Sequence, residues 1–488
     1  MLQIVVMIAG FILPKVMLTF YGSEINGLVS SITQFVLYLT LIEAGLSGAT
    51  IYSLYKPLAD NNKISINRVI TAAKNFYYRI GFLFILLLIG GAILYPLFVQ
   101  SDLLSSLEIS LIFVVLGTNG ILEFFTLAKY RALLTADQKT YVISIAGIVQ
   151  TIINVIIIWS LSVSGFSIII VRLVAIIAIL VRSLILWIYC KIKYKYLDFS
   201  VEPDYSSLDK RKGALYFQII GVVQIGSPVI IATIFLTLND VSIYAVYYVV
   251  VGGISAILSI FTSGISAGFG DLITRGEKRS LKNAFQQFEY LYYMFITVVY
   301  SVMLFTFVPF VKIYTANADI NYIYPALAIL LTLNGYFYSL KTPYGMLTIA
   351  AGKYSESIFP ITIQALLQIV IGSVLVLFLG LNGIIIGAII SNLYRVFEFV
   401  DFAPKHLIDY SFKDSLIMWI RSFVIFSILC IVLYFVPNNF ITGYLSWLLY
   451  AIILVIISTF IVFVINAFAD KNKLIGSLLR IKSIVKGK

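Results

Sequence analysis

The sequence predicts an all-α polytopic membrane protein with about fourteen transmembrane helices. Of its 488 residues, 61% are apolar and only 11% are charged, whereas soluble globular proteins are about 45–50% apolar and about 25% charged. The apolar residues form continuous runs, such as the one at 80–98, and not the alternating pattern of an outer-membrane barrel. Similar features also recur along the chain at a near-constant spacing. The composition and the continuous apolar runs exclude a water-soluble fold, and the recurrence indicates an internal repeat.

Each predicted span is a stretch of about 20 mostly apolar residues, the length that crosses a bilayer. The first begins at Met1, inside an apolar run without the charged leader of a secretory signal. The predicted spans are 1–21, 28–55, 77–98, 108–130, 141–162, 166–190, 213–236, 242–268, 284–310, 322–343, 357–379, 383–402, 415–436 and 444–468.

The distribution of Lys and Arg predicts the orientation of these spans. Thirty of the 34 Lys and Arg residues lie in one alternating set of connections or in the tail, and only Lys312 lies in a connection on the other face. Because cytoplasmic loops are enriched in Lys and Arg, we expect a multi-pass protein of the cytoplasmic membrane with both termini in the cytoplasm. The net charge of +12 is thus a topology signal. Nucleic-acid binding would need a soluble basic domain, which the predicted organisation does not contain.

An internal repeat organises the chain. Gln150 is matched by Gln364, and Gly165 is matched by Gly380 at a nearly equal offset. Six spans per copy is an even number, so both copies enter the membrane in the same direction, as in transporters with parallel repeats. The predicted organisation is an N-terminal six-helix lobe (1–190), a basic cytoplasmic linker (191–212), a C-terminal six-helix lobe (213–403), two additional helices (414–468) and a basic cytoplasmic tail (469–488).

Two prolines occupy matching positions of the repeat. Pro14 and Pro228 are separated by the same offset as Gln150 and Gln364, and each lies inside a predicted span. A mid-span proline removes a backbone hydrogen bond and kinks the helix. Interrupted helices at matching positions of two halves are typical of a transport site, and a packing kink is the alternative.

Three basic residues lie inside predicted spans. Lys15 and Arg172 are each six residues from the outer end of a span, about 9 Å below the outer membrane edge. Because intramembrane charges tend to face a cavity, this matched depth predicts a site for an anionic group. The alternative is snorkelling to the outer headgroups. Arg182 lies closer to the cytoplasmic end, where snorkelling is the favoured interpretation.

Two acidic residues, Glu43 and Glu123, lie in the predicted inner half of their spans. Glu43 shares one helix face with Thr33, Thr40 and Ser47, which predicts a polar stripe. A carboxylate in an apolar setting takes up a proton readily, so both residues are candidates for ion coupling. The alternative is a structural pair with a Lys or Ser of a neighbouring helix.

Several functional classes lack their motifs. Gly352-Lys353 has no partner glycine for an ATP-binding loop, and His406 lies alone in a polar connection. The outer connections are short and contain no Asp-x-Asp pair. Cys190 and Cys430 both adjoin apolar segments, so no disulfide is expected. We therefore expect no enzymatic activity, no catalytic residue, no cofactor and no metal.

The stretch from Pro14 to Arg79 carries a family resemblance. It contains Pro14 before Tyr21-Gly22, then Asn26-Gly27, Glu43-x-Gly45 and Tyr55-Lys56-Pro57. Together with the plan of six, six and two spans, these features resemble the polysaccharide-export flippases of the Wzx type. Those flippases belong to the superfamily of multidrug, oligosaccharidyl-lipid and polysaccharide exporters, which also contains the lipid II flippase.

The resemblance implies a function and a set of site residues. The substrate would be an oligosaccharide repeat unit on polyprenyl pyrophosphate, moved from the inner to the outer leaflet for O-antigen or capsule biosynthesis. Two lobes would alternately open a central cavity to each side, driven by an ion gradient or the membrane potential. A polysaccharide polymerase and a chain-length regulator would be partners. Lys15, Arg172 and Arg182 would bind the substrate with the polar residues Gln34, Gln150, Asn154, Gln218, Gln224, Gln364 and Asn392.

Three alternative functions remain. A cation-coupled multidrug exporter of the same superfamily would prefer acidic groups in its cavity, whereas this sequence mixes acids and bases. A membrane polysaccharide polymerase or ligase would need larger outer connections. A purely structural assembly factor would not require charges inside the membrane.

Overall fold

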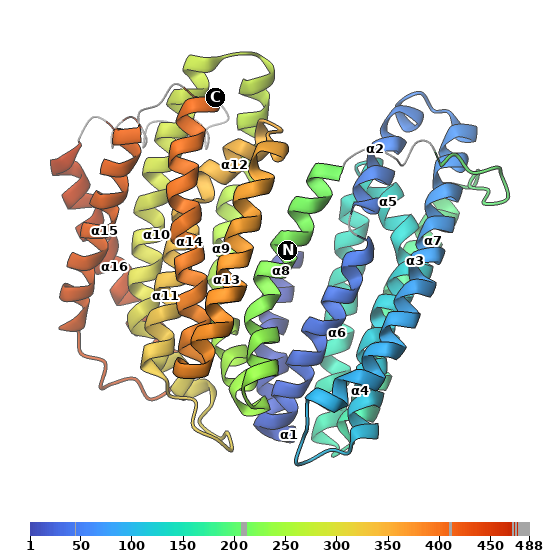
Figure 1. Cartoon of the computed structure of the whole chain (residues 1–488), viewed down its shortest axis with the longest axis horizontal. Helices are drawn as coiled ribbons and strands as arrows, with labels where there is room; N and C mark the ends of the chain where they lie inside the picture. Colours follow the sequence, from blue (N-terminus) through green and yellow to red (C-terminus); the bar gives the residue numbers. More distant parts are fainter. Residues whose placement is uncertain (44, 206–211, 409–411, 471–472, 474–475, 477–488) are drawn as a thin grey trace. The chain divides into compact units, whose positions relative to one another are not determined.

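The computed structural model describes residues 1–43, 45–205, 212–408, 412–470, 473 and 476. Every regular element in this part of the chain is a helix, which confirms the all-α fold class (Figure 1). The elements are α1 (Leu2–Leu39), η1 (Thr40–Glu43), α2 (Leu46–Ala59), α3 (Lys63–Phe98), α4 (Ser106–Leu122), η2 (Glu123–Leu127), α5 (Ala128–Ala136), α6 (Thr140–Val163), α7 (Ile168–Lys193), α8 (Lys212–Phe235), α9 (Leu238–Thr274), α10 (Lys278–Tyr314), α11 (Pro325–Leu340), α12 (Thr342–Ala350), α13 (Tyr354–Leu379), α14 (Leu381–His406), α15 (Phe412–Tyr434) and α16 (Tyr444–Ala469).

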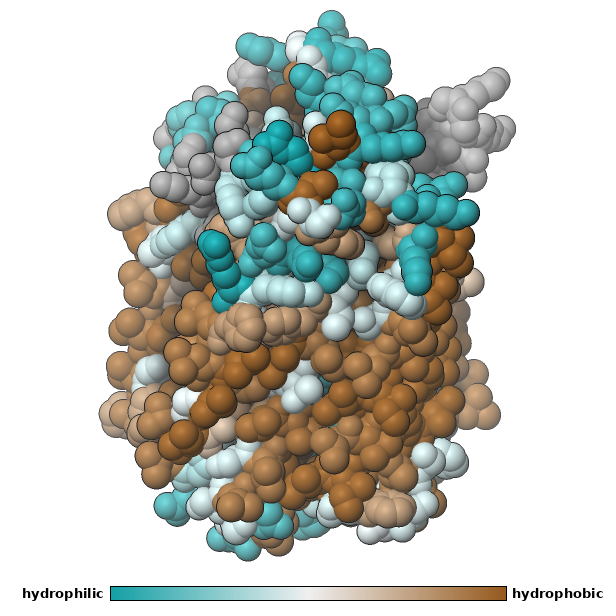
Figure 2. All heavy atoms as spheres, turned by 90° about the vertical axis from the view of Figure 1, so that its right-hand side faces the viewer, coloured by the Kyte–Doolittle hydropathy of each residue, from teal (hydrophilic) through white to brown (hydrophobic). Residues whose placement is uncertain are grey.

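The length and apolar composition of the helices are typical of a membrane protein. Eleven helices of the described chain are long and apolar enough to cross a membrane. All fourteen predicted spans fall on helices, and three features explain the smaller number. The segment from Leu2 to Glu43 is continuous enough to be one candidate, α11 is only 16 residues long, and α14 carries Arg395 and Glu398. Figure 2 shows a hydrophobic belt between two hydrophilic ends on the face formed by α3 and α7.

Gly22 divides α1 into two helical halves that match the first two predicted spans. Its backbone has φ +81° and ψ 178°, a conformation that glycine adopts without steric cost, and the α1 ribbon doubles back near its label in Figure 1. The amide of Ser23 donates to both carboxylate oxygens of Asp319 at 3.1 Å, and its hydroxyl also donates to Asp319. Partial burial raises the pKa of Asp319, but these hydrogen bonds outweigh burial, and the net pKa is lowered.

The chain forms two compact units. Unit 1 comprises Met1–Val246 and Asn317–Ile320, and unit 2 comprises Tyr247–Ala316 and Asn321–Lys488. Unit 1 thus includes α8, which the sequence repeat assigns to the C-terminal lobe. The six-helix lobes remain a prediction.

Hydrogen bonds between α1 and α8 explain why α8 belongs to unit 1. The Thr233 hydroxyl donates to the hydroxyl of Ser31 at 2.7 Å. The Tyr38 hydroxyl donates to the carbonyl of Val223 at 2.7 Å. Buried polar groups need such partners, so these bonds define how the two helices pack.

The helix bounds recur at the spacing of the sequence repeat. In the first copy α3 begins at Lys63, and in the second copy α10 begins at Lys278. In the same way α7 begins at Ile168 and α14 begins at Leu381, and both are 26 residues long. The offsets of these two helix pairs are nearly equal. The spacing seen in the sequence is therefore also the spacing of the helices.

In unit 2, buried side-chain hydrogen bonds attach α15 to α10. The indole Nε1 of Trp419 donates to the hydroxyl of Tyr293 at 2.7 Å. The hydroxyls of Thr297 and Ser422 are 2.7 Å apart. α16 is attached in a similar way, because the indole of Trp447 donates to a carbonyl of α10 at 2.9 Å. The two helices outside the repeat are therefore integral parts of unit 2.

The orientation in the membrane can be tested with reporter fusions at Leu197, Asn317 and Lys473. Leu197 follows α7, Asn317 lies between α10 and α11, and Lys473 follows α16. Because the predicted topology puts thirty Lys and Arg residues on one side and one in a connection on the other, we expect cytoplasmic, external and cytoplasmic signals, respectively. An external signal at Lys473 would contradict an even number of crossings.

Candidate functional site

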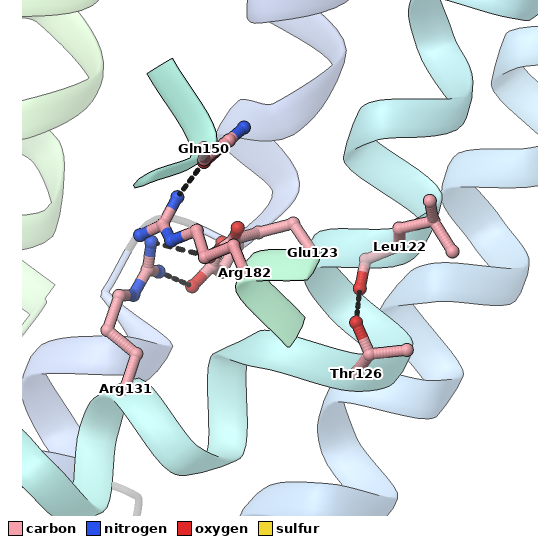
Figure 3. Close-up of polar contacts among 7 residues, drawn as sticks. Leu122, Glu123, Thr126, Arg131, Gln150 and Arg182 are labelled. Atoms are coloured by element: carbon pink, nitrogen blue, oxygen red, sulfur yellow. Dashed lines mark hydrogen bonds and ion pairs between the residues drawn. The ribbon is translucent and has the colours of Figure 1, made fainter. Parts of the chain in front are cut away.

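A polar cluster inside unit 1 is centred on Arg131 of α5 (Figure 3). Its Nη2 lies 2.9 Å from Oε1 of Glu43, and its Nη1 lies 2.7 Å from Oε1 of Glu123. The Arg131 side chain is 31% exposed, and the Glu43 and Glu123 side chains are 14% and 18% exposed. One guanidinium group thus serves two carboxylates that are largely withdrawn from solvent.

Two helix irregularities position the carboxylates. Glu43 is the last residue of η1, a 3₁₀ turn, and Gly45 has φ +85° immediately before α2. Glu123 is the first residue of η2, a π-helical turn between α4 and α5. π-helical turns are rare and often occur at functional sites. Both acids therefore lie where a regular helix is interrupted.

The π turn brings Glu123 and Arg131 onto one face. Eight residues of a regular helix would separate their directions by about 80°. A π turn adds one residue, so the pair is equivalent to a seven-residue spacing, which is within about 20° of alignment. Within the wide turn, the Thr126 hydroxyl donates to the carbonyl of Leu122 at 2.5 Å (Figure 3).

The predicted polar stripe of span 2 differs from the structure. Its predicted residues do not continue along one regular helix, because the 3₁₀ turn and Gly45 change the angle between successive residues. The hydroxyls of Thr33 and Thr40 donate to carbonyls of their own helix at 2.6 and 2.7 Å. Glu43 instead finds its partner on α5.

Gln150 and Arg182 extend the site. Nη1 of Arg182 donates to Oε1 of Gln150 at 3.1 Å, which joins α7 to α6. In Figure 3 the guanidinium groups of Arg131 and Arg182 point toward the same region beside Glu123. We call these residues the Arg131 cluster: Glu43, Glu123, Arg131, Gln150 and Arg182. Its two arginines and two glutamates are balanced in charge when ionised.

Arg172 is a half-buried cation elsewhere in unit 1. Its Nη2 donates to Sδ of Met17 at 3.3 Å, and its Nε is buried without a hydrogen-bond partner. Lys15 is two residues before Met17 on α1, so it projects about 200° around the helix from Met17. The two cations therefore approach from different faces of α1, and their shared anion site remains a prediction.

The other predicted residues of unit 1 are distributed along several helices. Gln34 lies half-buried beside α8, where its Oε1 would be 3.0 Å from a Cβ at Gly226. Gln218 is exposed, whereas Gln224 and Asn154 are half-buried. Their role in substrate binding remains a prediction.

The predicted prolines lie inside helices that continue through them. Pro14 is in the first half of α1, and Pro228 is buried in α8. The backbone interruptions of α1 and α4–α5 lie instead at Gly22 and at the π turn. A transport role for the prolines remains a prediction.

Unit 2 contains a network of amide groups around a buried lysine. Nζ of Lys341 donates to Oδ1 of Asn392 at 2.9 Å, and Nε2 of Gln364 donates to the same oxygen at 3.1 Å. The Asn392 amide donates in turn to Asn334 at 2.9 Å. Lys341 is 9% exposed, and its ammonium group lies 4.4 Å from the ring centroid of Tyr338.

Two further buried groups of unit 2 were not identified from the sequence. Glu289 of α10 is fully buried and accepts a hydrogen bond from the Tyr344 hydroxyl. Arg395 is 1% exposed and pairs with Glu398 at 2.5 Å. Arg131 follows the predicted span 108–130, and Lys341 and Arg395 lie in the last part of the predicted spans 322–343 and 383–402, where these overlap the connections in which all three residues were counted.

Some of these residues could have been found by extending the predicted helices beyond their apolar segments. Arg395 follows the apolar face of α14 without a helix-breaking residue, and Glu398 is three residues later on the same helix. A pair at that spacing is typical of a continuing helix. Arg131, by contrast, offers no such signal, because its alignment depends on the π turn.

The described residues contain no group of three or more His, Cys, Asp or Glu side chains that could hold a metal ion. Both cysteines are free, Cys190 buried and Cys430 half-buried.

Comparison with models of known protein families found no match, and comparison with curated proteins found none either. Solved structures do match. One is titled the lipid II flippase MurJ in an inward closed conformation, with a TM-score of 0.68, 16% identity and coverage of 96% of this chain and 99% of that chain.

Another match is an inward-facing multidrug resistance MATE family transporter of the MOP superfamily, with a TM-score of 0.65, 15% identity and coverage of 87% of this chain and 95% of that chain. A third, MATE in a bent conformation, has a TM-score of 0.55, 16% identity and coverage of 88% and 93%. The chain shares its fold with these solved structures. At this low identity the likeness concerns the fold, so the substrate has to be inferred from side-chain chemistry.

Proposed function

We propose that this chain is a flippase for polyprenyl-pyrophosphate-linked oligosaccharides. It moves them from the inner to the outer leaflet of the cytoplasmic membrane by alternating access. The products serve the biosynthesis of a surface polysaccharide such as O-antigen or capsule. The polymerase and the chain-length regulator implied by the Wzx-type resemblance are its expected partners.

The distribution of buried charge carries this proposal. Glu43 and Glu123 share Arg131. Arg172, in contrast, has no described carboxylate within ion-pair distance. Holding such cations away from water costs several kcal/mol unless an anion accompanies them. A pyrophosphate is a suitable anion, because its charge-assisted hydrogen bonds are of the strong kind.

The fold supports a lipid-linked substrate. The match to the lipid II flippase structure covers 96% of this chain, whereas the matches to the MATE structures cover 87–88%. An amide network such as that of Gln364, Asn392 and Asn334 offers donors and acceptors that suit sugar hydroxyls. The polyprenyl tail can remain in the bilayer and needs no apolar pocket.

Glu289 favours the alternative of a cation-coupled multidrug exporter. A fully buried carboxylate on α10 is a group that a cationic drug or a coupling ion could use. The MATE structures share the fold, so this alternative is tested beside the flippase.

Binding of a labelled polyprenyl-pyrophosphate oligosaccharide to purified protein tests the proposal. We expect Arg172→Gln to weaken binding at least about ten-fold, the equivalent of about 1.4 kcal/mol, because it removes a cation that would contact the pyrophosphate. Lys312→Gln is the matched control, since Lys312 is an exposed cation near the end of α10.

The competing ligand distinguishes the two functions. A lipophilic cation should not displace the labelled lipid from wild-type protein. Displacement by the cation, together with unchanged lipid binding in Arg172→Gln, would contradict the flippase and support the exporter. Circular dichroism of each variant checks that the helices are retained.

A further inference from the structure

Two lysine side chains of unit 1 flank the same pair of aromatic rings. Nζ of Lys74 lies 5.6 Å from the ring centroid of Tyr78 and 5.2 Å from that of Phe199. Nζ of Lys129 lies 5.3 and 5.6 Å from the same two centroids and 5.2 Å from that of Tyr130. A cation within about 6 Å of a ring face is attracted to it, so the rings hold both ammonium groups in one place.

Phe199, one of the two rings beside the lysines, belongs to the linker between the two repeats. The carbonyl of Tyr196 accepts from the Asn67 amide at 2.8 Å, and the Tyr205 hydroxyl accepts from the Asn75 amide at 3.3 Å. These contacts fix both sides of Phe199 to α3. Phe199 is therefore positioned over the lysines by the fold, and not by a chance approach of a loop.

The lysines have no negative partner within the described chain. No described carboxylate forms an ion pair with Lys74 or Lys129. Lys129 is only 9% exposed. Its polar contacts, to the Tyr78 hydroxyl and the Phe125 carbonyl, are both 3.4 Å long, which is beyond the usual range of a strong hydrogen bond. Two like charges are thus held together with donor capacity to spare.

Helix length places the lysines at the level of lipid headgroups. α3 ends at Phe98, and a crossing takes about 20 residues. Counting back from Phe98 puts Tyr78 at the opposite interface, where tyrosine is favoured, and Lys74 one turn beyond it. By the predicted topology this interface is cytoplasmic. Figure 2 shows hydrophilic residues at both ends of this face of the molecule, with more of them at one end.

We propose that Lys74 and Lys129, walled by Tyr78 and Phe199, form a binding site for the phosphate group of an inner-leaflet lipid. A phosphate can accept hydrogen bonds from both ammonium groups at once and cancels their repulsion. The apolar rings exclude water and strengthen these contacts. The site is independent of the flippase proposal, because it uses none of the cations assigned to the transported substrate.

Lipid titration of purified protein in detergent tests the site. The readouts are the melting temperature and lipid retention in native mass spectrometry, with phosphatidic acid and phosphatidylglycerol as probes and diacylglycerol as the phosphate-free comparison. We expect both phospholipids to raise the melting temperature and diacylglycerol to leave it unchanged. Lys129→Met and Lys74→Gln should each weaken phosphatidic acid binding at least ten-fold.

A second measurement separates this role from a purely structural one. Without added lipid, Lys129→Met should melt at or above the temperature of the wild type, because it removes a buried charge that repels Lys74. A structural cation–π contact predicts the opposite. Lys191→Gln is the control, because Lys191 is an exposed lysine whose Nζ lies 4.8 Å from the Trp187 ring centroid. This variant should bind phosphatidic acid as tightly as the wild type does.

Three results would count against the proposal in different ways. Inorganic phosphate that protects wild-type protein as well as phosphatidic acid does, and loses its effect in Lys129→Met, would support the phosphate chemistry but overturn the lipid source. Equal lipid binding by wild type, Lys129→Met and Lys74→Gln would overturn the site. The site would also be overturned if Lys129→Met, without added lipid, melts at a lower temperature than the wild type and still binds the lipid.

Discussion

Arg131→Met is expected to destabilise the protein by about 3 kcal/mol, the lower end of the range seen when one partner of a buried ion pair is removed. The substitution leaves Glu43 and Glu123 without the guanidinium that lies 2.9 and 2.7 Å from them. Methionine keeps much of the apolar stem of arginine, so the loss reports on charge more than on volume. Thermal unfolding of purified protein in detergent measures the effect.

A variant that lacks all three ion-paired groups provides the control. Arg131→Met combined with Glu43→Gln and Glu123→Gln removes all three charges and should recover most of the lost stability, because no uncompensated carboxylate remains. Glu43→Gln alone keeps the pair between Arg131 and Glu123, so it should change stability by less than about 1 kcal/mol. If Arg131→Met melts like the wild type, the Arg131 cluster does not exist as an ion-paired unit.

Glu43→Gln is therefore also the variant with which ion coupling can be examined. This variant keeps the ion pair between Arg131 and Glu123. A loss of transport in a variant that still folds would therefore be a functional defect. The assignment of Glu43 and Glu123 to ion coupling remains a prediction, and the structure shows that any protonation of either acid would also act on Arg131.

Gly27→Ala is expected to destabilise the packing of α1 against α9 by about 3 kcal/mol, the upper end for overpacked cores. A Cβ at Gly27 would lie 1.9 Å from the carbonyl oxygen of Leu238 and 2.8 Å from its carbonyl carbon. Both are backbone atoms, so no side-chain rotation can relieve the clash. The neighbouring Asn26 amide, which donates to the Ser242 hydroxyl at 2.8 Å, would lose its geometry as the helices separate.

Gly10→Ala is the matched control on the same helix. No atom lies within 4 Å of a Cβ at Gly10, and alanine is a better helix former than glycine by up to about 1 kcal/mol. Its melting temperature should equal or slightly exceed that of the wild type. Similar losses in both variants would mean that helix propensity, and not the close approach at Gly27, decides the result.

The sequence motif that contains Asn26 and Gly27 shows how far sequence reasoning extends. The two residues were part of the resemblance to Wzx-type flippases, but no local pattern supplied a physical reason for them. The reason is the contact with Leu238 and Ser242, which lie in a distant part of the chain. A contact over that separation depends on the packing of whole helices, so local patterns do not contain it.

Glu43, Glu123, Gln150 and Arg182 were each selected from the sequence for separate reasons. The structure places them together around Arg131, which the predicted topology had assigned to a cytoplasmic connection. Charge in an apolar context was sufficient to select Glu43, Glu123 and Arg182, and Gln150 was selected as a hydrogen-bonding group for a sugar. Their grouping required the π turn of η2 and the packing of α5, α6 and α7, which no periodicity indicates.

The sequence by itself determined that this is a helical membrane protein with a repeated plan of helices. The physical reason is strong and local: in the bilayer every backbone amide and carbonyl needs an internal partner, so each long apolar segment becomes a helix. Only the tertiary structure decided which buried charges meet, because partners such as Glu43 and Arg131, 88 residues apart, are selected by helix packing. It also decided that Lys74 and Lys129 share two rings without a carboxylate, since those rings come from α3 and from the linker that folds back onto it.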